Sequence, residues 1–455
     1  MTQDVLAPGI PGLTQADVER IAADEPAWLR ERRLAAWRTY ESLGLPDPGD
    51  EEWRRTPIRE IEFEAAVAYS GNATVASVAA LPPVARAAWD DAPMAGYHVQ
   101  VDSSVVLSRL TEEARARGVV VMDLHAAATE HRALVEQYLY SLVPVDEWKF
   151  VALNAALWSG GAFVYVPRGV EVHLPLHLIT GAAAESLLMA PRTLVVVEAQ
   201  ARLKVIDETV SVESAAQRVV SAATEFIVGD GAEVEYYSVN RWGDAVYNFH
   251  TVRARLGRDA KFTALAAGIG SRLTKMRVDV EMPEAGAQTQ LVGITFGDGD
   301  QHFDYNTLQD HVGAHTVSDL QFKSALTDRA SLVWYGVTRI NPGASASEAN
   351  QTSRNLLLSE HAKAAPIPIL EIEAYDVAKC SHGATAGPVE ETELFYLESR
   401  GIPRERAEQM LVEGFFADVA DRIPDARVRE RVMDAVLAKA GGVAGALTYE
   451  EMMEA

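Results

Sequence analysis

The chain is poor in cysteine, and this scarcity limits where it is expected to work. Cys380 is the only cysteine among 455 residues, so no disulfide can form within the chain. The first ten residues, MTQDVLAPGI, lack the basic-then-apolar layout of a secretory signal. Both features are typical of a protein of a reducing compartment. We therefore expect a cytoplasmic protein.

Long apolar runs, basic charge and common catalytic motifs are also missing. No stretch approaches the ~20 uninterrupted apolar residues of a membrane span. The formal charge of -24 opposes binding to phosphate backbones, which depends on Lys and Arg. No GxxxxGK(S/T) motif or GxSxG elbow occurs, and Gly268-Ile269-Gly270 does not continue into a dinucleotide fingerprint. The sequence predicts no nucleic-acid partner, no membrane partner and no ATP hydrolysis by this chain itself.

The composition is that of a globular protein, and the spacing of apolar residues divides the chain into three successive regions. Apolar residues make up 48% and charged residues 23% of the chain, a balance typical of folded domains. Helical spacing of apolar residues prevails over 1–145, short alternating runs prevail over 146–388, and helical spacing returns over 389–455. We expect an N-terminal helical domain, a β-rich core and a C-terminal helical domain with these bounds.

A repeat of alanines marks the β-rich region. Ala232, Ala260, Ala287 and Ala314 each precede an alternating run and are spaced by 28, 27 and 27 residues. A period of this length is typical of one coil of a solenoid, in which a small residue suits a tight corner. Ala330 precedes a similar run but breaks the period. The pattern predicts a mainly β protein with a β-helix core, and the alternative is a β-sandwich with regularly spaced turns.

Cys380 and His382 are the candidate ligand pair. Residues two apart on a strand point to the same face, with Cα atoms ~6.6 Å apart, so a strand through both would present a thiolate and an imidazole together. Thiolates are the standard ligands of iron–sulfur clusters, and histidine can replace them. With no second cysteine, the remaining ligands must come from another subunit or a small molecule. The alternative is that Cys380 is a small buried hydrophobe.

Two looser groups of histidines carry less information. His173 and His177 are four apart, but Pro175 between them excludes a helical zinc pair. His302, His311 and His315 form the second group, without the acidic residue that a metal site would add. We expect both groups to be solvated or hydrogen-bonded strand residues.

Several segments share the pattern of a known family. They are NQTSRNLLLS at 350–359, KCSHGAT at 379–385, LFYL at 394–397, SRGI at 399–402 and, further upstream, GAFVYVP at 161–167. Together they resemble the SufB/SufD family of iron–sulfur cluster assembly scaffolds. The resemblance covers about the last two thirds of the chain. It implies a right-handed parallel β-helix flanked by helical segments, and a scaffolding role without turnover.

The resemblance also implies partners and a cargo. It implies pairing with a SufB-like paralogue, docking of a SufC-like ABC ATPase on the C-terminal helices, and a nascent iron–sulfur cluster bound at the subunit interface by Cys380 and His382. The SufB branch needs a further cysteine within its β-helix, so the lone Cys380 fits the SufD branch. Some relatives form homodimers, so a second copy is an alternative partner. A flavin is compatible with the family, although no residue pattern here indicates one.

The rival function is a β-helix enzyme that acts on polysaccharides with acidic side chains in a groove. Such enzymes are usually secreted, and no cluster of acids on neighbouring coils stands out in the sequence. Fold alone does not decide function. A third possibility is a structural β-solenoid that self-assembles.

Overall fold

The computed structural model describes residues 12–47, 49–63, 67–68, 74–75 and 77–441. The first ten residues, on which the expectation about a secretory signal rests, lie outside this part of the chain. The last fourteen residues of the expected C-terminal domain, 442–455, also lie outside it. No helix in the described part is long and apolar enough to cross a membrane.

Helices and short strands are mixed in the first part of the described chain. An unbroken series of strands follows, and three helices end it. The helices are α1 Gln15–Ile21, α2 Ala27–Ser42, α3 Pro83–Ala88, α4 Glu112–Ala116, α5 Leu124–Glu130, α6 Arg132–Tyr138, α7 Lys149–Leu157, α8 Glu391–Glu398, α9 Arg404–Ala420 and α10 Ala426–Lys439. The strands are β1 Val67–Ala68, β2 Gly96–Val101, β3 Ser104–Leu110, β4 Val120–Asp123, β5 Ala162–Val166, β6 Leu176–Ala182, β7 Leu187–Met189, β8 Arg192–Val197, β9 Arg202–Ser211, β10 Arg218–Val228, β11 Glu233–Arg241, β12 Val246–Leu256, β13 Lys261–Gly268, β14 Leu273–Met282, β15 Gln288–Gly297, β16 His302–His311, β17 Val317–Leu326, β18 Ser331–Ile340, β19 Glu348–Leu357, β20 Lys363–Ile372 and β21 Lys379–Pro388.

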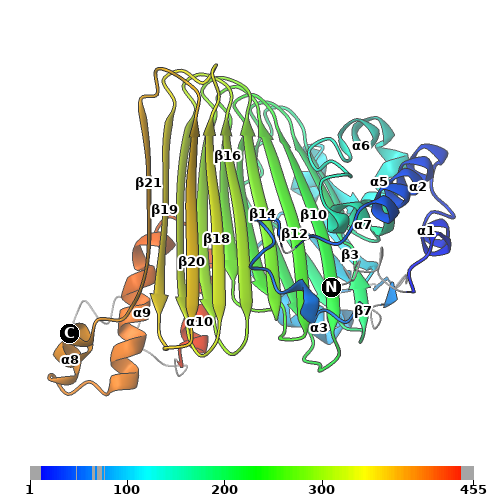
Figure 1. Cartoon of the computed structure of the whole chain (residues 1–455). Helices are drawn as coiled ribbons and strands as arrows, with labels where there is room; N and C mark the ends of the chain where they lie inside the picture. The colour runs from blue at the N-terminus through cyan, green and yellow to red at the C-terminus, as the bar shows by residue number, and fades with distance from the viewer. Residues whose placement is uncertain (1–11, 48, 64–66, 69–73, 76, 442–455) are drawn as a thin grey trace, which may run out of the picture.

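The strands form a parallel β-solenoid, as predicted. One sheet has eleven strands and ends at β20, and the other has ten strands and ends at β21. From β8 to β21 the chain alternates between the two sheets, and each strand pairs in parallel with the strand of the next coil, as in β17 with β19 and β19 with β21. Figure 1 shows the coils stacked side by side from β10 to β21. This parallel stacking excludes the β-sandwich alternative.

The interior of the solenoid holds columns of side chains because residues in register stack on one another. One column runs from Phe226 through Ala254 and Val280 to Gln309, Thr338 and finally Leu370. Phe226 and Val280 are fully buried, and large aromatic side chains such as Phe262 and Trp334 fill neighbouring columns. Burial of each such side chain stabilises the fold by about 1.5–3 kcal/mol.

The alanine repeat marks the coil corners, with one correction. Ala232, Ala260 and Ala287 are fully buried, and each directly precedes a strand of the ten-stranded sheet. In the next coil Val317 is the residue in register with Gln288, so the corner position belongs to Thr316, and Ala314 lies two residues earlier. Ala330 precedes β18 of the opposite sheet, which is why it breaks the period.

The first 145 residues are helical only in part, which differs from the expectation. They contain α1 to α6, but β2, β3 and β4 also lie in this region and join the two sheets. The helices α1, α2, α5 and α6, together with α7, pack on the outer face of the eleven-stranded sheet, where Trp37 and Trp53 share an apolar cluster with Phe249 and Leu273. The short helix α3 packs instead on strands of the ten-stranded sheet. Figure 1 places α1, α2, α5, α6 and α7 together at this end of the solenoid.

The C-terminal helices α9 and α10 pack on the outer face of the ten-stranded sheet. Phe416 of α9 and Val432 of α10 are fully buried in one cluster with Ile294 of β15. Two ion pairs fasten the helices to the sheet: Lys323 of β17 to Asp418, and Glu208 of β9 to Arg431 at 2.6 Å. The first helix of this region, α8, lies beyond α9 at the edge of the molecule (Figure 1).

Candidate functional site

Cys380 and His382 lie on β21, the last strand of the ten-stranded sheet. Cys380 is in register with Ala349 of β19, and His382 is in register with Gln351. Ala349 and Gln351 are buried on the inner face of the solenoid. Because side chains in register share a face, Cys380 and His382 both point to that inner face. The strand through both residues therefore presents the thiol and the imidazole on one side.

The two donors sit in different surroundings. Cys380 is half-buried and packs against a cluster of Ile340, Ala344 and Ala349. Burial raises the pKa of the Cys380 thiol, so in this chain alone the thiol holds its proton at neutral pH. His382 is exposed. A metal that binds the sulfur must displace the thiol proton, because the thiolate is the ligand.

The last coil is open because no further described strand stacks on it. β20 ends the eleven-stranded sheet and β21 ends the ten-stranded sheet. Pro366 and Pro368 lie in β20 and lack N–H groups, whereas β21 has no proline before Pro388 at its end. Prolines discourage strand pairing at a sheet edge. β21 is therefore the better edge for a strand from another chain, and it carries the two donors.

The described chain does not complete a ligand set around these donors. No group of three or more His, Cys, Asp or Glu side chains in the described part could hold a metal ion. A cluster needs more ligands than one sulfur and one imidazole. Cys380 and His382 can therefore supply part of a coordination shell, and the described residues do not supply the rest.

The five histidines of the two looser groups have structural environments, as expected for hydrogen-bonded or solvated residues. His177 is fully buried and lies 3.3 Å from Glu208. His311 is fully buried, and both ring nitrogens lie 2.8 Å from hydroxyls, those of Thr316 and Ser318. His302 lies 2.8 Å from the Ser331 hydroxyl. The remaining two, His173 and His315, are exposed.

A polar section inside the solenoid was not anticipated from the sequence. Asp207 is buried and accepts a hydrogen bond from the Tyr236 hydroxyl at 2.8 Å. Burial raises the pKa of Asp207 to about 6. His250 faces the same cavity, and burial lowers its pKa to about 4. Polar residues at alternate positions, such as Asp207 and Thr209 in β9, are the only sequence signal of this section.

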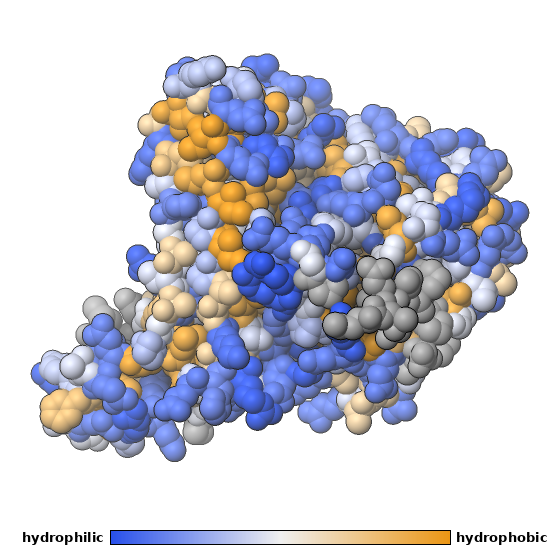
Figure 2. All heavy atoms as spheres, viewed as in Figure 1, coloured by the Kyte–Doolittle hydropathy of each residue, from blue (hydrophilic) through white to orange (hydrophobic). Residues whose placement is uncertain are grey.

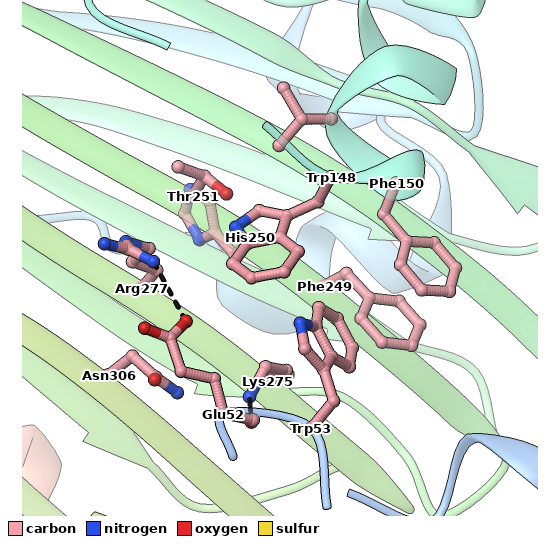
Figure 3. Close-up of a pocket in the computed structure, with 11 residues that line it drawn as sticks. Glu52, Trp53, Trp148, Phe150, Phe249, His250, Thr251, Lys275, Arg277 and Asn306 are labelled. Atoms are coloured by element: carbon pink, nitrogen blue, oxygen red, sulfur yellow. Dashed lines mark hydrogen bonds and ion pairs between the residues drawn. The ribbon is translucent and has the colours of Figure 1, made fainter. Parts of the chain in front are cut away.

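A second cavity lies where the N-terminal segment meets the eleven-stranded sheet. Figure 3 shows Trp53, Trp148 and Phe249 on one side and Glu52 near Arg277 on the other. The charged groups of this cavity pair with one another. Lys275 Nζ lies 2.8 Å from Asp304, and Arg277 lies 3.1 Å from Glu52 and 2.8 Å from Asp279.

This pairing bears on the rival function. A polysaccharide-active site requires carboxylates that are available to protonate or activate a substrate. Glu52, Asp279 and Asp304 are instead engaged with Arg277 or Lys275. The cavity is best described as a packed junction that fastens the segment around Trp53 to the sheet.

The outer face of the last coils is apolar. Val333 and Val337 of β18 and Ile367 and Ile369 of β20 occupy outward positions, and Val337 is in register with Ile369. All but the buried Val333 are partly exposed. Figure 2 shows an apolar region over these last strands. Contiguous apolar surface of this kind is typical of interaction sites, and here it adjoins the open edge.

The architecture first defines the chain as a parallel β-solenoid protein with helical segments at both ends. Comparisons with known proteins then identify the family. Residues 178–415 match the SufBD core domain of the SUF system for FeS cluster assembly, and residues 12–178 match the SufBD protein N-terminal region. The chain belongs to the SufBD family of iron–sulfur cluster assembly proteins.

Relatives from both branches of the family are similar over almost their whole length. The iron–sulfur cluster assembly protein SufD of Bacillus subtilis is 31% identical over 90% of this chain and 94% of the relative. SufB of the same organism is 27% identical over 91% of this chain and 90% of the relative. An iron–sulfur cluster assembly SufBD family protein of Staphylococcus saprophyticus is also 27% identical, with the same coverage.

Proposed function

We propose that this chain is a SufD-like scaffold subunit that binds a nascent iron–sulfur cluster together with a SufB-like partner. The observation that carries the proposal is a partial ligand set on an open strand edge. Cys380 and His382 share one face of β21, and β21 ends its sheet. The cluster is cargo here, assembled and passed on, so this chain needs no turnover of its own.

The SufD branch is supported by the cysteine content. The chain is similar to both SufD and SufB of Bacillus subtilis, at 31% and 27% sequence identity. Sequence identity alone is therefore weak evidence for assigning the chain to one branch. A sulfur-accepting scaffold needs a cysteine within its solenoid, and this chain has only Cys380, on the last strand. The partner therefore supplies the sulfur-accepting cysteine and the remaining ligands. An unpaired thiol persists in a reducing compartment, which supports the cytoplasm as the location.

A SufB-like partner fits the open end in two ways. The unpaired backbone groups of β21 can accept an added strand. The partly exposed Ile367 and Ile369 lie on the outer face of β20, the end strand of the other sheet, and a protein that covers the last coil would bury them. A second copy of this chain would bring a second Cys380 and His382, and it is the alternative partner.

The C-terminal helices offer a separate surface for a SufC-like ATPase. Phe395 and Tyr396 of α8 are 70% and 55% exposed, although aromatic side chains are usually buried. In contrast, α9 and α10 are fixed to the sheet through Phe416 and Val432. An ATPase that binds α8 and the outer sides of α9 and α10 would thus be linked mechanically to the solenoid.

Co-expression tests the assembly. A tagged form of this chain is expressed with a SufB-like paralogue and a SufC-like ATPase, and the purified material is analysed by size-exclusion chromatography and mass spectrometry. We expect one complex that contains all three chains. A chain that never joins the other two, or that forms only a dimer with itself, contradicts the heteromeric proposal.

Substitution of the two donors tests the site. Cys380→Ala and His382→Ala are each expected to lower iron and acid-labile sulfide in the anaerobically reconstituted complex severalfold, with assembly intact. Ser381→Ala is the matched control, because Ser381 lies between the donors, faces the other side of β21 and bonds Asn350 at 2.9 Å. Unchanged cluster content in both donor variants would reduce Cys380 and His382 to packing residues.

A further inference from the structure

Gln351 lies directly beneath His382 and has a buried oxygen without a donor. The Gln351 side chain is fully buried on the inner face of β19. Its Nε2 donates a hydrogen bond to the Ile369 carbonyl of β20 at 3.0 Å, which fixes the orientation of the amide. The Oε1 atom is buried and has no hydrogen-bond partner within the described residues. Buried acceptors are usually paired, so this one needs an explanation.

The ladder leaves one neighbour that can donate to this oxygen. Gln351 is in register with Leu320 on one side and His382 on the other. Leu320 has no polar hydrogen. Adjacent strands lie ~4.8 Å apart, and side chains in register share a face, so the imidazole of His382 can reach the Gln351 amide. His382 is exposed, which leaves its ring free to rotate toward Gln351.

The chemistry of a ligating histidine requires such an acceptor. A neutral imidazole has one N–H and one lone pair, and only the nitrogen with the lone pair can bind a metal. Histidines that bind metals nearly always donate the other ring N–H to an oxygen, which fixes the tautomer and the ring orientation. Cys380 has no comparable support, because the residue beneath it is Ala349.

We propose that Gln351 is a positioning residue for His382. Its Oε1 accepts a hydrogen bond from one ring N–H of His382, so that the other ring nitrogen presents its lone pair at the open edge. The role of that lone pair as a cluster ligand rests on the proposed function. The hydrogen bond and the fixed tautomer do not depend on it.

Nitrogen NMR of the histidine ring tests the inference without a cluster. The chain is labelled with ¹⁵N-histidine and measured at a pH of about 8, above the ordinary imidazole pKa of about 6.5, both alone and bound to a SufB-like partner. The His382 signals are assigned from their loss in His382→Ala. We expect one protonated and one unprotonated ring nitrogen with widely separated shifts, as for a single tautomer.

Three variants separate the hydrogen bond from general packing. Gln351→Met removes the acceptor, and the two His382 shifts should move toward an average. Gln351→Glu keeps an acceptor oxygen but loses the Nε2 bond to Ile369, and it should retain the separated shifts. Asn350→Ala is the matched control on the outer face, where Asn350 bonds Asp319 and Ser381 at 2.9 Å, and it should leave the shifts unchanged.

The outcomes distinguish this inference from the proposed function. His382 shifts that are the same in wild type and Gln351→Met, alone and in the complex, overturn the positioning role of Gln351. Shifts that respond to Gln351→Met support it, even where His382→Ala leaves cluster content unchanged, in which case only the ligand role fails. Should the ligand role hold, Gln351→Met lowers cluster content and Gln351→Glu restores it.

Discussion

The middle coils and the last coil of the solenoid have the same strand geometry but differ in what covers them. In the middle, Phe226 and Val280 are fully buried between two neighbouring coils. In the last coil, Leu370 occupies the same column but is only half-buried. A coil cannot bury its apolar side chains without a neighbour on each face. Among the described strands the last coil therefore lacks one neighbour, and the candidate site lies there.

Helices cover the outer face of the solenoid at the other end of the molecule. The first strands of the eleven-stranded sheet are covered on their outer face by α2 and α7, and Leu194 and Val196 of β8 are buried there. The outer face of β18 and β20 has no such cover within the described residues, and Ile367 and Ile369 are partly exposed. The contrast agrees with the proposal that a partner covers the open end.

The first test of this contrast shortens two side chains of the same interior column, one in the middle coils and one in the last coil. Phe226→Ala should lower the free energy of unfolding by about 3–5 kcal/mol, because it opens a cavity in a packed interior. Leu370→Ala should cost less than about 1 kcal/mol in the chain alone, since its side chain is already half solvated. Chemical denaturation of both variants provides the comparison. Equal losses would mean that the last coil is packed like the middle.

Ion pairs allow a second comparison. Arg192 and Glu225 form a fully buried pair at 2.7 Å, and Glu225 also accepts hydrogen bonds from the backbone of Leu142 and Val143. Glu225→Gln should cost about 3–5 kcal/mol, because Arg192 is left buried without a counter-charge.

The matched control for that substitution lies at the open end. Arg339 and Glu371 pair at 2.7 Å with exposures of 40% and 45%. Glu371→Gln should therefore change stability by less than about 1 kcal/mol. A similar loss in both variants, measured by denaturant midpoint, would contradict the difference in burial between the two regions.

The third test concerns the polar section of the middle coils and depends on pH. The pKa of Asp207 is raised to about 6, so the folded state binds an additional proton between the ordinary pKa and pH 6. The stabilisation is complete at low pH and is lost as the pH rises through about 6. The free energy of unfolding of Asp207→Asn should thus exceed that of wild type by up to about 3 kcal/mol at pH 8. At pH 4 the two proteins should differ little.

His250 and His311 act in the opposite direction and serve as an internal check. Burial lowers the pKa of each to about 4, so their contribution is complete above the ordinary histidine pKa and is lost as the pH falls through about 4. The contributions of His250 and His311 are present in both wild type and Asp207→Asn. They therefore cancel in the difference between the unfolding free energies of the two proteins. A difference between the two proteins that does not vary with pH would contradict the buried ionisation of Asp207.

Much of the fold could be predicted because coil geometry imposes a local pattern. Ala232, Ala260 and Ala287 revealed the period, since a tight corner accepts only a small side chain. Thr316 occupies the next corner in place of alanine, and its hydroxyl lies 2.8 Å from both His311 and Ser347. No local sequence pattern predicts this substitution. The strands β2 to β4 were missed because they depend on pairing with distant strands, such as β2 with β6.

Only those features of the site that lie within one strand could be predicted from the sequence. The spacing of Cys380 and His382 was sufficient to place both on one face of β21. The position of Gln351 beneath His382 was not predictable, because it depends on the register between strands 31 residues apart. The half-burial of Cys380 against the cluster of Ile340, Ala344 and Ala349 likewise depends on contacts between segments distant in sequence. The role of the pair as cluster ligands stays a proposal.

The smallest expected effect concerns the reactivity of the only thiol. Because burial raises the pKa of Cys380, its alkylation rate by iodoacetamide should still increase above pH 9, where a free thiol with a pKa of about 8.5 approaches its plateau. Mass spectrometry reports the rate without interference, since Cys380 is the only cysteine. A plateau at or below pH 8.5 would contradict the apolar surroundings of the sulfur.

Amide hydrogen exchange tests the central claim most directly. Exchange is followed by mass spectrometry in the chain alone and after mixing with a SufB-like partner, for β21, for β20 and for the middle strands β12 and β14. The middle strands should be protected in both samples, and β21 should exchange rapidly alone and become at least tenfold slower in the complex. Equal exchange of β21 in the two samples would contradict a partner at the open edge.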